Sequence, residues 1–130
     1  MKNLVQSVLM MLFCVIAKQS VATEVSVDLI KKQLEAAHSQ YLSGDQQKSV
    51  NALEQLAKLL QYHQSPALDS QIGPNNLAYT YLRLGVLHEK SGDTSKATSY
   101  FSKALLSYKG DKVELEQLKT QVQSLDRRSL

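Results

Sequence analysis

Histidine and carboxylate side chains are the residues of this chain that could bind a metal or move a proton. Three histidines occur, His38, His63 and His88, and Glu35 lies three residues before the first of them. A Glu-x-x-His pair on a helix is half of a carboxylate-bridged metal site, which needs a second such pair and further carboxylates. Neither of the other histidines has a glutamate at this spacing. We therefore expect no metal, no cofactor and no catalytic residue, and a small metal-dependent enzyme is the least favoured hypothesis.

Two further classes of chemistry find no support in the residues. The chain has no glycine-rich phosphate loop, and its arginine and aromatic residues do not cluster as in nucleic-acid-binding proteins. Of its 15 basic residues, Lys2 and Lys18 lie in the first 22 residues, which leaves 13 basic residues against 12 acidic ones in the rest. This near balance gives no reason to bind nucleic acid or an acidic membrane.

The first 22 residues follow the plan of a secretory signal peptide. Lys2 precedes an apolar run over residues 4–17, and small residues end the segment at Ala22. We predict a periplasmic or secreted bacterial protein that is cleaved after Ala22, with Ala17 as the less favoured site. The alternative is an uncleaved anchor in the inner membrane, although a membrane span needs about 20 apolar residues.

The single cysteine, Cys14, lies inside this apolar run. A lipoprotein acylation site resembles a small residue followed by cysteine, whereas Phe13 stands there. We therefore expect no lipid anchor. Cleavage after Ala22 removes the cysteine, so the exported chain has to fold on its packed core without a disulfide.

Helical periodicity and composition predict that residues 23–130 form one all-α domain. Leu, Ala, Gln, Lys and Glu dominate, and the whole chain contains only five Gly and two Pro. Apolar residues from Val27 to Tyr41 recur at steps of three and four, which indicates one helix. Gly44 ends it and Asp45 caps the next helix, so we expect a hairpin over about residues 25–63.

A second hairpin is expected over about residues 75–108. Pro66, Gly73 and Pro74 make residues 64–74 a flexible connection, and Asn75 is a suitable cap for the following helix. That helix carries apolar residues on two faces, which indicates that it is sandwiched. Gly92-Asp93 then repeats the stop and start of the first hairpin.

A C-terminal helix is expected over about residues 111–127, where Asp111 and Glu114 have the spacing of a capping box. One narrow stripe is apolar and the opposite side is polar, which suits a capping helix over an exposed edge of the core, or a homodimer contact. The stripe consists of Leu115, Leu118, Val122 and Leu125, and the polar side of Lys112, Lys119, Gln121 and Gln123.

The second hairpin resembles a tetratricopeptide repeat (TPR), which has aromatic, Leu-Gly, aromatic and small residues at set intervals. The matching positions are Tyr81, Leu84, Gly85, His88, Ala97, Phe101 and Ala104. His88 stands where Tyr is usual, and Lys109 where Pro is frequent. Small side chains at Gly85 and Ala97 are expected to let the two helices approach closely.

The first hairpin matches this pattern in side-chain volume only. Gly44 and Gly92 lie 48 residues apart, whereas the family's repeat is about 34 residues long. The resemblance therefore implies two TPR-like antiparallel hairpins plus a capping helix, without regular superhelical stacking.

The resemblance also implies that the first helix of each hairpin lines a groove for a protein or peptide partner. Carried over position by position, the partner-binding residues are Lys31, Leu34, His38, Tyr41, Tyr79, Leu82, Val86 and Glu89. Leu34, Leu82 and Val86 are equally suited to the core, whereas tyrosines offer large contact area with few rotors to freeze. The Lys and Asn clamp of the chaperone-binding members has no counterpart, so recognition of a terminal carboxylate is not expected.

We therefore predict an exported adaptor or scaffold that binds a protein or peptide partner, and no enzyme. The second hypothesis is a structural homo-oligomer joined through the apolar stripe of the C-terminal helix.

Overall fold

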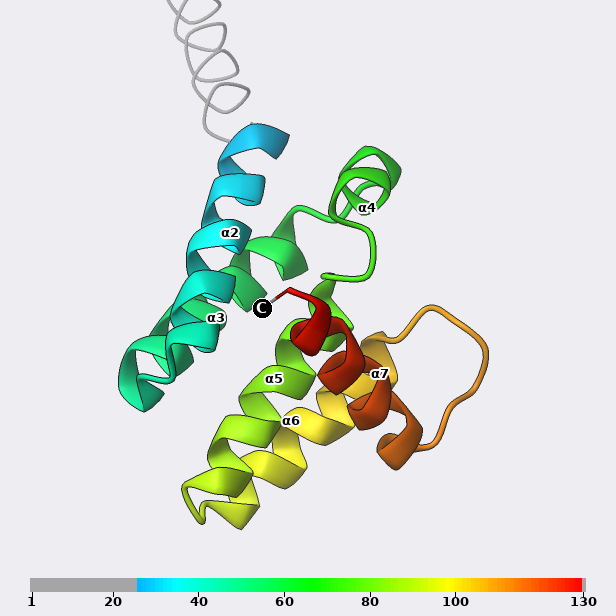
Figure 1. The fold of residues 1–130 in the computed structure, drawn as a ribbon. Helices are drawn as coiled ribbons and strands as arrows, with labels where there is room; N and C mark the ends of the chain where they lie inside the picture. Colours follow the sequence, from blue (N-terminus) through cyan, green and yellow to red (C-terminus); the bar gives the residue numbers. More distant parts are fainter. Residues whose placement is uncertain (1–25, 130) are drawn as a thin grey trace, which may run out of the picture.

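The computed structural model describes residues 26–129, and within this range the chain forms six α-helices and no strand (Figure 1). The helices are α2 (Val27–Ser43), α3 (Gln46–Tyr62), α4 (Pro66–Ile72), α5 (Leu77–Lys90), α6 (Thr94–Ser107) and α7 (Leu115–Arg128). The all-α prediction is confirmed. The predicted signal peptide and its cleavage site lie outside the described residues. None of the described helices is both long and apolar enough to cross a membrane.

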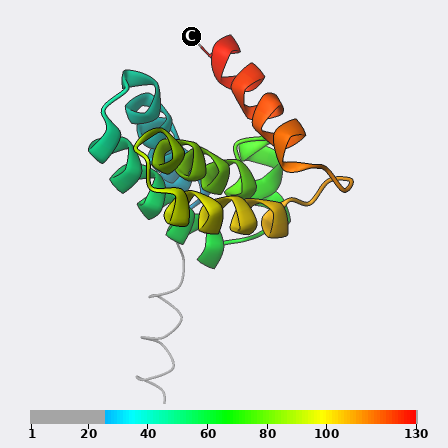
Figure 2. The ribbon, with the colours of Figure 1, turned by 90° about the horizontal axis from the view of Figure 1, so that it is seen from below.

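Two Gly-Asp turns connect helices that are neighbours in the sequence. Gly44 and Gly92 both have a φ of 84°, the left-handed conformation that glycine adopts at no steric cost. The carboxylates of Asp45 and Asp93 then accept hydrogen bonds from the backbone N–H of Lys48 and Lys96. Helices α2 and α3 pack together on one side of the molecule and α5 and α6 on the other (Figures 1 and 2).

Helix α5 occupies the centre of the fold. It packs against α6, α3 and α7, and every residue from Ala78 to His88 is buried. A helix with apolar residues on two faces has to be covered on both sides, and this is the arrangement that the sequence predicts for it.

The closest approach of α5 and α6 is at Gly85. A Cβ atom built on Gly85 would lie 2.5 Å from two ring carbons of Phe101. The ring of Phe101 therefore fills the space that any larger residue would need, while Ala97 and Ala104 are buried on the same helix as Phe101. The expected role of Gly85 in close helix packing agrees with this contact.

Three local predictions are wrong. Residues 64–74 contain α4, because Ser65 caps it, Pro66 starts it, and Leu68 and Ile72, one turn apart, are both buried. Helix α5 is capped by Asn76 and not by Asn75, the cap that the sequence predicts. Helix α7 begins at Leu115 and not near residue 111. Its capping box is formed by Glu114 and Gln117, whose side chain accepts a hydrogen bond from the backbone N–H of Glu114 at 3.1 Å.

Candidate functional site

Helix α7 lies across the face of α5 that the sequence assigns to the partner groove. Figure 1 shows α7 crossing α5, and Figure 2 shows it on one side of the α5 and α6 layer. Leu118 and Val122, four residues apart, are 0% and 2% exposed within the core. We call the residues under α7, which are Tyr79, Arg83 and Glu89 of α5 and His38 of α2, the α7 seat.

A buried ion pair joins the seat to the C-terminal end of α7. Nη2 of Arg83 donates hydrogen bonds to Oδ1 of Asp126 at 2.8 Å and to Oδ1 of Asn75 at 3.0 Å. Arg83 is only 3% exposed, and Nε2 of His38 lies 3.4 Å from the same Asp126 oxygen. That contact has no hydrogen-bond geometry, because His38 Nε2 is buried without a partner among the described residues. Helices α2, α5 and α7 thus meet at one carboxylate.

Tyr41 completes this group, which we call the Arg83 cluster: His38, Tyr41, Arg83 and Asp126. The guanidinium carbon of Arg83 lies 5.8 Å from the centroid of the Tyr41 ring, within the range of a cation–π contact. Burial raises the pKa of the Tyr41 hydroxyl, the negative charge of Asp126 raises it further, and Arg83 opposes both. These effects favour the neutral form of the Tyr41 hydroxyl.

Two further polar contacts hold the remainder of α7. The hydroxyl of Tyr79 donates to Oε1 of Gln121 at 3.2 Å. Nζ of Lys119 lies 3.2 Å from Oε1 of Glu89 and 4.9 Å from the centroid of the Phe101 ring. Lys119, which the sequence places on a free polar side, thus packs against α5 and α6, whereas Gln121 remains exposed while it accepts the bond from Tyr79.

The structure separates the predicted partner-binding residues into three groups. Leu82 is fully buried and Val86 nearly so, which places both in the core and corrects their assignment to an open groove. Tyr79, His38 and Glu89 contact α7. Lys31, Leu34 and Tyr41 of α2 remain partly exposed.

Sequence reasoning missed Arg83, Asn75 and Asp126. A signal for Arg83 was present, since a helix with apolar residues on two faces leaves little open surface for a charged residue between them. The partner of such an arginine cannot be read from periodicity, because Asp126 follows it by 43 residues.

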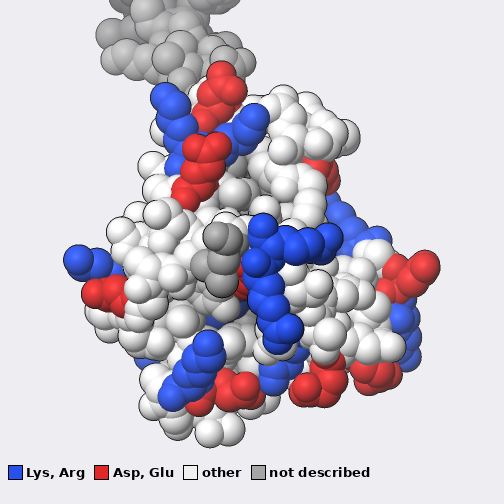
Figure 3. Space-filling model, in the orientation of Figure 1, with Lys and Arg blue, Asp and Glu red and all other residues white. Residues whose placement is uncertain are grey.

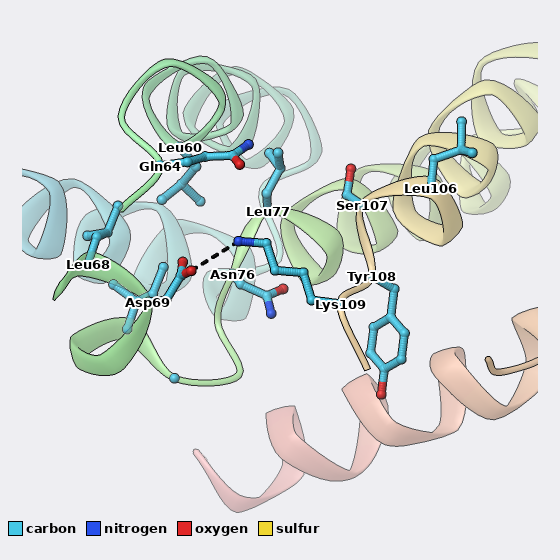
Figure 4. Close-up of a pocket in the computed structure, with 12 residues that line it drawn as sticks. Leu60, Gln64, Leu68, Asp69, Asn76, Leu77, Leu106, Ser107, Tyr108 and Lys109 are labelled. Atoms are coloured by element: carbon cyan, nitrogen blue, oxygen red, sulfur yellow. Dashed lines mark hydrogen bonds and ion pairs between the residues drawn. The ribbon is translucent and has the colours of Figure 1, made fainter. Parts of the chain in front are cut away.

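A separate cavity of about 400 Å³ opens between the ends of α3, α4, α5 and α6 (Figure 4). Leu60, Leu68 and Leu77 line it, and Nζ of Lys109 lies 3.0 Å from Oδ2 of Asp69 across its opening. Leu106, on its rim, is 87% exposed. Lys109 is largely exposed, Asp69 is about half-exposed, and the two are already paired, so neither offers a buried charge to a ligand.

The remaining described residues offer little further chemistry. Over residues 26–129, no three His, Cys, Asp or Glu side chains are grouped closely enough to hold a metal ion. The rings of His88 and Tyr100 are stacked with centroids 5.5 Å apart. Figure 3 shows Lys and Arg side chains gathered over the C-terminal part of α7, whose last turn contains Arg127 and Arg128. The candidate site therefore consists of the α7 seat and the adjoining face of α2.

Comparisons with protein-family models, curated proteins and solved structures find no match to this chain. The resemblance to tetratricopeptide repeats thus rests on the sequence positions given above, and inferences about function rest on the site itself.

Proposed function

We propose that the chain is an exported adaptor with a TPR-like fold, which binds a protein or peptide partner along α2, beside the face of α5 that α7 covers. The observation that carries the proposal is the stripe of Lys31, Leu34, His38 and Tyr41 along α2. These residues follow one another at steps of three, four and three, and all four remain partly accessible. Leu34 and Tyr41 also pack against the core, so their orientation is fixed before a partner arrives.

Burial of the stripe of α7 disfavours the homo-oligomer hypothesis. Leu118 and Val122 are buried within their own chain. A contact between two copies through these residues would first require α7 to leave its seat.

Site-specific photocrosslinking in the native cell envelope tests the adaptor proposal. A photoreactive amino acid at Leu34 is expected to form crosslinks to a defined partner. The same amino acid at Lys58, which is exposed on α3, serves as the matched control and is expected to give none. Identical products from both positions, or none from either, would reject the proposal.

Export is tested on the same material. Mass spectrometry of the protein from the envelope fraction is expected to give Thr23 as the N-terminal residue. Recovery of the intact chain from the membrane fraction would favour the anchored alternative.

A further inference from the structure

Helix α7 contacts its seat with one side of a single helix. Leu118, Val122 and Asp126 are spaced four residues apart, which places them on one stripe of the helix. Two of them are buried apolar residues and the third supplies the carboxylate to Arg83. The α7 seat therefore accommodates an amphipathic helix with this pattern.

Arg83 makes the seat selective for a carboxylate. A buried guanidinium needs a compensating negative charge and hydrogen-bond acceptors, and within residues 26–129 its ion-pair partner is Asp126 of α7. Asp126 does not satisfy it completely, because Nε of Arg83 has no hydrogen-bond partner among the described residues. A carboxylate that reached both Nη2 and Nε would bind in the two-point geometry that arginine favours.

Helix α7 also leaves part of the seat unfilled. A hollow of about 400 Å³ lies beside it, lined by residues of both helices that include Tyr79, Gln121 and Leu125. An occupant with larger apolar side chains at the positions of Gln121 and Leu125 would bury more surface than α7 does.

The connection between α6 and α7 allows the exchange of one helix for another. It spans residues 108–114, most of which are exposed, so α7 is held mainly by the seat contacts described above. A short tether gives an attached helix an effective concentration on the order of millimolar. A partner helix that fits the seat better can exceed this advantage.

We propose that α7 is the resident occupant of the partner groove. The partner is an amphipathic helix that replaces α7 and presents a carboxylate to Arg83, eight residues after its first buried apolar residue. This inference rests on the proposed adaptor function and specifies the class of partner.

Binding of a peptide to an opened form of the chain tests the inference. The chain, purified in its exported form, carries Leu118→Asp and Val122→Asp so that its own α7 leaves the seat. The probe is a fluorescent peptide of residues 111–130, and we expect saturable binding. Asp126→Asn in the peptide is expected to weaken binding about tenfold or more, because it removes a charge-assisted hydrogen bond to a buried group.

Glu116→Gln provides the matched control. It removes the same charge from the peptide, but the Glu116 side chain is 83% exposed and its ion pair is with Lys119 of its own helix. We expect this peptide to bind like the original. Equal affinities of the Asp126→Asn and Glu116→Gln peptides would overturn the inference. So would an opened chain that still unfolds cooperatively but does not bind the original peptide.

Hydrogen exchange of the unmodified chain gives a second test that does not depend on the opened form. An excess of the original peptide is expected to speed exchange in the chain's own α7, and the Asp126→Asn peptide is expected to have little effect. Unchanged exchange with both peptides counts against the proposal. A dimer formed by mutual exchange of α7 also overturns it, because the occupant would then be a second copy.

The two proposals fail separately. If crosslinks from Leu34 identify a partner but the folded, opened chain does not bind the peptide, the adaptor function is supported and the exchange of α7 is rejected. If the peptide binds but no partner is crosslinked, binding of a helix in the α7 seat is supported and the adaptor function is rejected.

Discussion

Gly85 and Phe101 show how one side chain sets the distance between two helices. The α5 backbone at Gly85 is so close to the Phe101 ring that no Cβ fits between them without movement. The same ring receives the ammonium group of Lys119 at 4.9 Å. Phe101 therefore links the hairpin of α5 and α6 to α7.

Replacement of Gly85 by alanine is expected to destabilise the protein. Overpacking a core costs about 1–3 kcal/mol, whereas the higher helix propensity of alanine returns about 1 kcal/mol. We expect a net loss of up to about 2 kcal/mol in the free energy of unfolding, measured by urea denaturation. In a Phe101→Leu background the same change should cost clearly less. An equal cost in both backgrounds would show that Phe101 is not the obstacle.

Tyr100 links stability to alkaline pH. Burial, together with the hydrogen bond that its hydroxyl donates to Glu54 at 3.1 Å, raises its pKa to about 12. The pKa of an unfolded tyrosine is near 10. The neutral Tyr100 side chain therefore contributes its full stabilisation of the fold below about pH 10, and this contribution is lost as the pH rises through about 12. We expect the free energy of unfolding to fall less for Tyr100→Phe than for the original chain between about pH 9 and about pH 11. Parallel declines would contradict this assignment.

At the scale of elements, α4 is a packed helix rather than a tether. Leu68 is 2% exposed and also borders the cavity of Figure 4. Truncating a buried leucine costs about 2–5 kcal/mol, and the cavity should allow the site to relax. We therefore expect Leu68→Ala to cost about 2 kcal/mol, and the exposed Gln71→Ala within about 0.5 kcal/mol of zero. A negligible effect of Leu68→Ala would support the flexible connection that the sequence predicts.

Local signals predicted most of the elements, and ambiguous local signals explain the helix that was missed and the helix start that was misplaced. The Gly-Asp turns and the periodicity of α2, α3, α5 and α6 depend on residues close together in the sequence, and their positions were predicted closely. Helix α4 was missed because it has only seven residues, begins at a proline and is followed by Gly73 and Pro74, and this composition is typical of a loop. The start of α7 was misplaced because Asp111 and Glu114 offered the same capping signal as Glu114 and Gln117.

At the scale of the whole molecule, the stripe of α7 is a contact within one chain. We expect the chain without residues 1–22 to be a monomer at micromolar concentration, and we expect Leu118→Asp to release α7 while the protein stays monomeric. Light scattering measures the mass, and hydrogen exchange over Leu115–Arg128 measures the release. A dimer that this substitution converts to monomers would support the homo-oligomer hypothesis instead.

The candidate site was predicted only in part, for reasons that also belong to this scale. An amphipathic stripe shows that α7 has to cover something, but not which surface it covers. Because α7 lies on the inner face of α5, that face is not open, and the residues expected there divide between the core and the α7 seat. The stripe on α2 is partly accessible, and α7 approaches it at His38 and Tyr41 through Asp126.

The distribution of contacts along the sequence also sets the order in which the chain assembles. Each hairpin joins neighbouring helices through a short turn, so closing it loses little chain entropy, whereas the bond from Arg83 to Asp126 spans 43 residues. We expect the α7 amides to become protected last during refolding, which pulse-labelled hydrogen exchange measures. The groove would then be vacant for a short time in every newly made molecule, and a partner present at that moment would meet no competitor.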